Sequence, residues 1–194
     1  MAGIDYKFIS DREGGQKLKG YVPAAGVSKS GVTIATGFDL GARKEADLKK
    51  LGISGNLLIK LKPYLGNQKK DAVNYLKKNP PSITKADADK IDKTVKSLDL
   101  VKIKTNYNAA VGAGKTKFDS LFSEAQTVIS SVGFQYGPGF KSKAPTFWKH
   151  ITTQDWEKAI AELRKFGNNY PTRRKLEADL LEKGWKREKA KVKK

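Results

Sequence analysis

The side chains that could carry out hydrolytic chemistry lie near the start of the chain, where Glu13, Thr33 and Asp39 stand out. Glu13 follows an amphipathic run and precedes two glycines, which predicts a helix over residues 5–13 with Asp5 as its N-cap and Glu13 at its C-terminal end. The unpaired carbonyl groups at such an end disfavour ionisation of a nearby carboxyl group. A carboxyl group that keeps its proton suits the role of general acid.

Thr33 and Asp39 belong to the segment 32–40, VTIATGFDL, which predicts the only convincing strand of the sequence. Side chains alternate across a strand, so one face would be mainly apolar and the other would carry Thr33, Ala35, Gly37 and Asp39. The small, polar second face suits the floor of a groove for a chain-like substrate. The alternative is a half-exposed hairpin with ordinary polar residues on its outer side.

A protonated carboxyl group, an ionised carboxylate and a hydroxyl that holds water are the minimum groups needed to cleave a glycosidic bond. The chain has no Cys and one His, which excludes disulfide scaffolds, Cys nucleophiles and Cys/His zinc sites. We therefore expect catalysis without a metal or other cofactor. The run DADKID at 87–92 has the wrong acid spacing for a calcium loop and predicts a solvated helix face.

The formal net charge of +19 predicts attraction to polyanions: nucleic acid, an anionic membrane or an acidic cell envelope. No specific nucleic-acid motif is recognisable, although a nucleic-acid-binding protein stays an alternative. The start of the chain has acidic residues where a signal peptide would be apolar, and no run approaches the ~18 apolar residues of a membrane span. We expect the protein to stay in the cytoplasm of its host until it is released to the cell wall.

The remaining patterns predict an α+β fold, with an N-terminal helix and a small antiparallel sheet followed by a mostly helical lobe. The predicted limits are a catalytic domain over 1–183, made of a small β lobe at 17–41 and a helical lobe at 42–183, and a basic tail at 184–194. The predicted helices of the second lobe cover 43–51, 55–65, 68–78, 85–98, 100–111, 118–136, 144–151, 154–166 and 171–183, the last of these beginning at Pro171.

Several runs resemble the active-site signature of pesticin-like muramidases, the bacterial-toxin relatives of phage lysozymes. They are Glu13-Gly14, Gly20-Tyr21-Val22-Pro23 and the segment from Ser30 to Gly41. The run SVGFQYG at 131–137 and the segment from Trp156 to Arg173 are similar to two further parts of phage lysozymes. The resemblance implies a lysozyme-like fold and a muramidase that cleaves the β-1,4 bond between N-acetylmuramic acid and N-acetylglucosamine in peptidoglycan.

The resemblance also implies roles for single residues. Glu13 takes the position of the general acid, Thr33 that of the water-positioning hydroxyl, and Asp39 that of the second carboxylate. The sequence has no Asp or Glu from 14 to 38, where phage lysozymes of the better-known branch carry their second acid, so Asp39 must serve. The water-binding Thr33 favours an inverting mechanism. Substrate-binding positions are Tyr21, Gln135 and Asn169, and Arg173 matches an arginine that pairs with the catalytic Glu.

We expect a monomer that acts on peptidoglycan, as a phage endolysin because the lysozyme-like part begins at the first residue. An antibacterial toxin or effector is the alternative. The basic C-terminus, with Leu176, Leu180, Leu181 and Trp185, is a candidate for contact with an anionic membrane or lipopolysaccharide.

Overall fold

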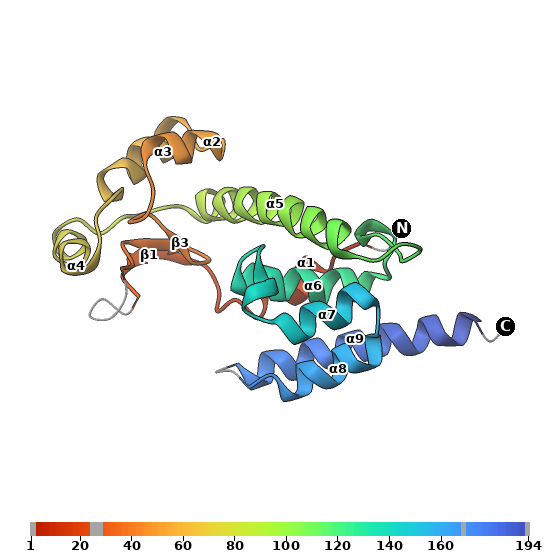
Figure 1. Cartoon of the computed structure of the whole chain (residues 1–194). Helices are drawn as coiled ribbons and strands as arrows, with labels where there is room; N and C mark the ends of the chain where they lie inside the picture. Colours follow the sequence, from red (N-terminus) through yellow and green to blue (C-terminus); the bar gives the residue numbers. More distant parts are fainter. Residues whose placement is uncertain (1–2, 24–28, 168–169, 193–194) are drawn as a thin grey trace. The chain divides into compact units, whose positions relative to one another are not determined.

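The computed structural model describes residues 3–23, 29–167 and 170–192, and it has the α+β architecture that the sequence predicts, with one small antiparallel sheet and many helices (Figure 1). The chain folds as two compact units. One is Glu13–Ser97, and the other joins the residues up to Arg12 to those from Leu98 onward. This division differs from the predicted lobes at 17–41 and 42–183, because the helices that directly follow the sheet share its hydrophobic core.

The unit Glu13–Ser97 is built on three strands. These are β1 (Lys17–Tyr21), β2 (Thr33–Ala35) and β3 (Phe38–Asp39), which are antiparallel and lie in the order β1-β2-β3. Its helical elements are α2 (Glu45–Lys50), α3 (Gly55–Leu61), the 3-10 helix η1 (Lys62–Tyr64), α4 (Lys69–Lys78) and the first part of α5 (Lys85–Ala110). Apolar side chains of the sheet and of these helices form one buried cluster, which removes the inner face of the sheet from water.

The segment that was predicted as one strand over 32–40 is a tight hairpin. β2 ends at Ala35, whose φ of 49° is left-handed, and Gly37 follows with a φ of 81°, so the chain reverses between β2 and β3. Ile34 then lies opposite Phe38. All three residues of β2 are buried, so the predicted alternation of a core face with an open face is wrong here.

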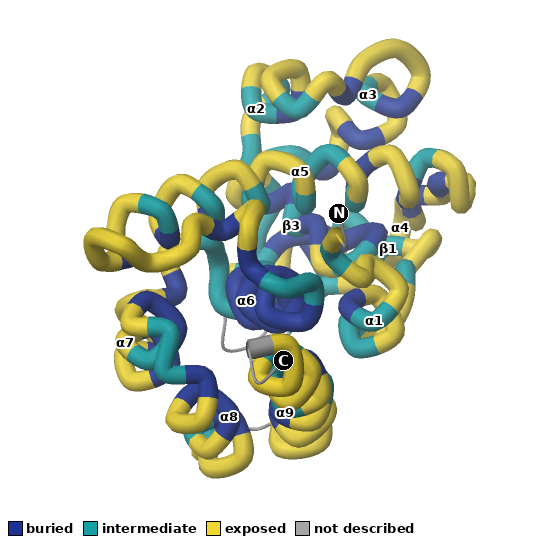
Figure 2. The backbone as a smooth tube through the Cα atoms, turned by 90° about the vertical axis from the view of Figure 1, so that its right-hand side faces the viewer, coloured by how far each residue is buried: buried dark blue, intermediate teal, exposed yellow. Residues whose placement is uncertain are grey.

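The second unit is organised around one buried helix. Its elements are α1 (Tyr6–Ser10), the later part of α5, η2 (Phe118–Ser120), α6 (Ser123–Tyr136), η3 (Phe140–Ser142), α7 (Pro145–Thr153), α8 (Trp156–Lys165) and α9 (Pro171–Val192). α6 is buried from Glu124 to Gly133, and Figure 2 shows most of it in dark blue. It packs against α1, α9 and η3, while α8 packs against α7 and α9. The core of this unit therefore surrounds α6.

The ends of two helices confirm sequence signals, and one differs. The Asp5 carboxylate accepts a hydrogen bond of 2.8 Å from the amide of Phe8, as predicted for an N-cap, and Pro171 is the first residue of α9. The first helix ends at Ser10, short of the predicted residue 13. Glu13 thus lies in the turn after α1, beyond the helix end at which it was predicted.

Two predicted interruptions are absent. The predicted helices 85–98 and 100–111 form the single helix α5, since no Gly or Pro separates them. The predicted tail from 184 onward is helical as far as Val192. Its cations pair with acidic groups, Arg187 with Glu124 at 2.7 Å and Lys189 with Glu157 at 2.7 Å. The described residues include no helix with both the length and the apolar character needed to cross a bilayer.

Candidate active site

Three of the predicted site residues form a row across the sheet. Tyr21 on β1 lies opposite Thr33 on β2, and Thr33 lies opposite Asp39 on β3. Residues directly opposite each other on antiparallel strands share a face, with Cβ atoms about 4.5–5.5 Å apart. Tyr21 is 37% exposed, Thr33 is 2% exposed and Asp39 is half-buried. The structure therefore brings the predicted hydroxyl and the second carboxylate together, although through a hairpin instead of one strand.

The Asp39 carboxylate is held by the main chain. Its Oδ1 atom accepts hydrogen bonds from the amides of Gly31, at 3.0 Å, and Gly41, at 2.8 Å. The two glycines are in such close approach that a Cβ on Gly31 would lie 2.3 Å from the Cα of Gly41, so neither tolerates a side chain. The spacing of Gly31, Asp39 and Gly41 in the sequence thus produces a clamp that fixes one carboxylate oxygen.

The Thr33 hydroxyl has a defined polarity. Its hydrogen is donated to the carbonyl oxygen of Gly31 over 3.2 Å. Because a hydroxyl has one hydrogen and two lone pairs, this bond leaves Oγ1 available only as an acceptor. Thr33 can therefore accept a hydrogen from a water molecule beside Asp39, which is the role expected of it.

Glu13 forms an ion pair that the sequence did not suggest. Its Oε2 atom lies 2.6 Å from Nζ of Lys96 on α5, and the two side chains are only 11% and 19% exposed. The turn that carries Glu13 is also fixed on its N-terminal side, where the Arg12 guanidinium lies 3.4 Å from the centre of the Phe8 ring and donates to the Phe8 carbonyl. Glu13 therefore sits beside an ammonium group in a restrained turn.

One face of α5 connects the Glu13 turn to the β2–β3 hairpin. The Asp92 carboxylate accepts from the Thr36 amide at 3.0 Å, from the Thr36 hydroxyl at 2.6 Å and from the Gln16 side chain at 2.9 Å. Gln16 also donates to Asp89 at 2.7 Å. The segment 87–92 is therefore not simply the predicted solvated face. Sequence reasoning missed Asp92 and Lys96, whose i,i+4 spacing places them on one helix face but does not reveal their partners.

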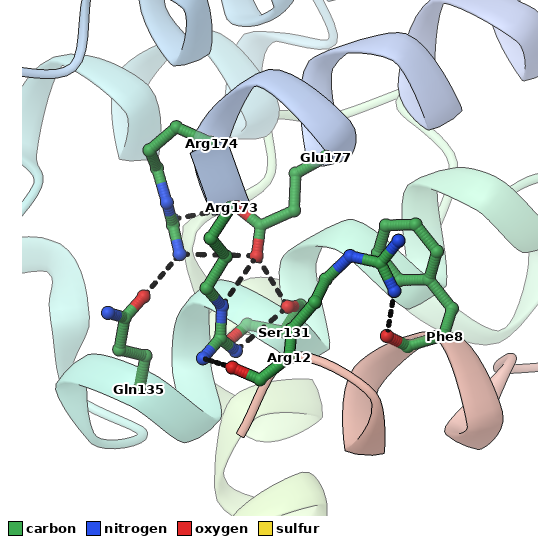
Figure 3. Close-up of polar contacts among 7 residues, drawn as sticks. All are labelled: Phe8, Arg12, Ser131, Gln135, Arg173, Arg174 and Glu177. Carbon is green, nitrogen blue, oxygen red and sulfur yellow. Dashed lines mark hydrogen bonds and ion pairs between the residues drawn. The ribbon is translucent and has the colours of Figure 1, made fainter. Parts of the chain in front are cut away.

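The other predicted residues lie in the unit that contains α6 and α9. Arg173 donates to the carboxylate of Glu177 at 3.2 Å, to the Ser131 carbonyl at 3.0 Å and to the Arg12 carbonyl at 3.4 Å (Figure 3). The last contact holds the peptide that immediately precedes Glu13. The predicted pairing of Arg173 with Glu13 itself stays a prediction.

Gln135, at the end of α6, accepts a hydrogen bond from Arg174 (Figure 3). Sequence reasoning missed Arg174 and Glu177, although their i,i+3 spacing on a helix is a recognisable ion-pair signal. Asn169, the last predicted substrate-binding position, lies outside the described residues. The part of the chain that the structure covers contains no group of three or more His, Asp or Glu side chains placed to hold a metal ion.

The small sheet, the acidic turn before it and the helices that follow define an α+β protein of the lysozyme-like class. The family model Pesticin, described as a bacterial toxin homologue of phage lysozyme, C-term, matches residues 3–157, and the chain belongs to this family. The match includes Glu13, Thr33 and Asp39. No curated protein matches the chain. Family membership supports a muramidase-like peptidoglycan hydrolase or toxin.

Proposed function

We propose that the protein is a muramidase that hydrolyses the β-1,4 bond between N-acetylmuramic acid and N-acetylglucosamine in peptidoglycan. The observation that carries this proposal is the alignment of Tyr21, Thr33 and Asp39 in one row of the sheet, with the Asp39 carboxylate clamped by two amides. This arrangement suits a chain-like sugar that lies along the row, with an aromatic ring at one end and a carboxylate at the other.

Glu13 acts as the general acid in this proposal. It gives its proton to the glycosidic oxygen as the bond to the anomeric carbon breaks. The carboxylate that results lies beside the Lys96 ammonium, 2.6 Å away in the structure, which stabilises the new negative charge. Lys96 therefore favours the state of Glu13 that follows proton transfer, and it holds the carboxyl group in one orientation.

Thr33 and Asp39 act on the water molecule. Thr33 accepts one hydrogen of the water, which orients a lone pair towards the anomeric carbon, and Asp39 accepts the proton that the attacking water loses. The clamp engages Oδ1 of Asp39, so the Oδ2 atom is the one assigned to the water. A water between carboxylate and sugar gives an inverting reaction and an α-anomeric product.

The activity is tested with purified sacculi, whose turbidity falls as the glycan is cut, followed by mass spectrometry of the products. New reducing ends on muramic acid support the proposal, whereas new reducing ends on glucosamine, or released peptides alone, would contradict it. Glu13→Gln should abolish lysis with little loss of stability, because the amide keeps the shape and still accepts from Lys96 but has no acid proton.

The stereochemistry has its own readout. NMR spectra recorded during the first minutes of cleavage should show the α anomer first. A β anomer formed first would indicate retention and would give Asp39 the role of nucleophile instead of base.

Within this activity we propose the endolysin role, with a toxin or effector as the alternative. Both use the same catalytic groups and both benefit from the +19 charge, which attracts the protein to an anionic envelope. Expression in a bacterial cytoplasm should leave cells intact until the inner membrane is permeabilised from outside, and then lysis should be rapid. Lysis without permeabilisation would contradict the need for a separate release step.

A further inference from the structure

A buried cluster of charged side chains lies between α6 and α9, and Figure 3 shows it. Glu177 is 0% exposed and Arg174 is 1% exposed. Two nitrogen–oxygen pairs of 3.0 and 3.1 Å join Arg174 to the Glu177 carboxylate, and Arg173 adds a third at 3.2 Å. Ser131 on α6 donates its hydroxyl hydrogen to the same carboxylate. One carboxylate therefore holds two guanidinium groups.

Glu177 is what makes the burial of Arg174 possible. Burial lowers the pKa of Arg174 and raises the pKa of Glu177, since each loses the water that would stabilise its charge. The opposite charges and the fork of two hydrogen bonds offset this loss only while both partners are present. The position of the Arg174 side chain thus depends on the Glu177 carboxylate.

Arg174 in turn sets the orientation of the Gln135 amide. The Nη2 atom of Arg174 donates to Oε1 of Gln135. A guanidinium group carries donors only, so the amide must present its oxygen to Arg174 and direct its NH₂ group elsewhere. Within the described residues, Nε2 of Gln135 donates to no other group, and the side chain is only partly buried.

We propose that Gln135 is a fixed hydrogen-bond donor to the glycan, and that Arg174 and Glu177 are positioning residues that set the polarity of its amide. The inference rests on the proposed function, because the acceptor that we assign is the carbonyl oxygen of an N-acetyl group. Each sugar of the proposed substrate carries this neutral acceptor. A sugar without its acetyl group offers an ammonium group, which an amide NH₂ cannot bind.

The test measures binding of two soluble probes, chitotetraose and its fully de-N-acetylated form, to chains that also carry Glu13→Gln, so that nothing is cleaved. Gln135→Glu keeps the size of the side chain and its bond to Arg174 but replaces the donor by a second acceptor. We expect this variant to bind chitotetraose about tenfold more weakly, the usual effect of losing one good hydrogen bond. It should also gain affinity for the de-N-acetylated probe, whose ammonium groups a carboxylate attracts.

The chain offers a matched control for the positioning role. Glu124 on α6 forms a two-bond pair with Arg187 on α9, at 2.7 and 2.9 Å, and is also buried. It lies at the opposite end of α6 from Gln135, about 16 Å along the helix axis. Glu177→Gln and Glu124→Gln make the same chemical change between the same two helices. A purely structural role predicts equal effects of both on binding.

We expect Glu177→Gln to weaken chitotetraose binding severalfold and Glu124→Gln to leave it unchanged, at a temperature where thermal unfolding curves show both chains folded. Arg174→Lys, which keeps the charge but lacks the fork that holds both partners, serves the same purpose if Glu177→Gln does not fold. Unchanged binding in Gln135→Glu, or equal losses in the two Glu→Gln variants, would overturn the inference. Sacculus lysis by the unmodified chain is measured separately, so a failure of the proposed function is recognised on its own.

Discussion

Shape and charge can be separated at Asp39, because its Oδ1 atom receives two amide hydrogens. Asn keeps an oxygen that accepts from Gly31 and Gly41, whereas Ala leaves both amides without an acceptor. We predict that Asp39→Asn retains a thermal midpoint close to that of the unmodified chain and loses lytic activity by about 100-fold or more. Turbidity assays and thermal unfolding check the two effects.

The companion variant Asp39→Ala should be just as inactive and also less stable, by about 1–3 kcal/mol for the amides left unpaired. Full activity of Asp39→Asn would remove the second carboxylate from the mechanism and leave Asp39 as part of the hairpin only.

Lys96 can be tested through its dependence on Glu13. We predict that Lys96→Met lowers kcat about tenfold, because the carboxylate formed after proton transfer loses the neighbouring ammonium, and that Lys96→Arg keeps most of the activity. The double change Glu13→Gln with Lys96→Met should be no less active than Glu13→Gln alone, since Lys96 acts through Glu13. Initial rates at saturating soluble glycan give these values, and additive losses would assign Lys96 a separate role.

Single elements show where sequence reasoning succeeded and where it stopped. The helical regions, the N-cap at Asp5 and the start of α9 at Pro171 depend on neighbours within a few residues, so they were predictable. The hairpin was harder, because β2 has three residues and cannot display an alternation. A period of two needs a longer strand to be recognised.

The candidate site divides in the same manner. Glu13, Thr33 and Asp39 were identified from residue type and resemblance, and the sheet register then placed two of them opposite each other. Asp92 was not identifiable, because its partner Thr36 lies 56 positions away and nothing in either local sequence specifies the other. Contacts of this range follow from packing, which a pattern of nearby residues does not encode.

The role of α5 leads to a prediction at the level of the element. Asp92 accepts three hydrogen bonds that fix the hairpin and the Glu13 turn to this helix, so Asp92→Ala should lower stability by about 2–4 kcal/mol and reduce lysis. Asp89→Ala is the control on the same face, because Asp89 is exposed and should cost under about 1 kcal/mol. Denaturant unfolding gives both values, and equal stability losses would contradict the assigned role of Asp92.

At the scale of the whole molecule, the positive charge is not concentrated in a free C-terminal tail. Arg187, Lys189 and Lys191 all pair with carboxylates, which leaves fewer cations of this segment for a membrane surface than the sequence suggested. The predicted contact with an anionic membrane or lipopolysaccharide stays a prediction, as does the monomeric state. The net charge of +19 must then act mainly through the rest of the surface.

This charge predicts a strong effect of ionic strength. The initial rate of sacculus lysis should fall severalfold between about 20 mM and 500 mM sodium chloride, because the screening length shortens from roughly 20 Å to about 4 Å. Hydrolysis of a neutral soluble glycan fragment should change little over the same range. An equal decrease for both substrates would indicate an effect of salt on the folded structure instead.

The first helix belongs to the unit that begins again at Leu98, and its Asp5 amide bonds to the hydroxyl of Thr127 at 2.9 Å. During synthesis on the ribosome, the continuous stretch Glu13–Ser97 emerges complete and can fold while translation continues. The α1 segment, made first, has to wait for α6 and α9, the latter made last, before it finds its partners. The peptide before Glu13 is therefore secured only near the end of translation, so a truncated product that stops before α9 would have an unanchored general acid.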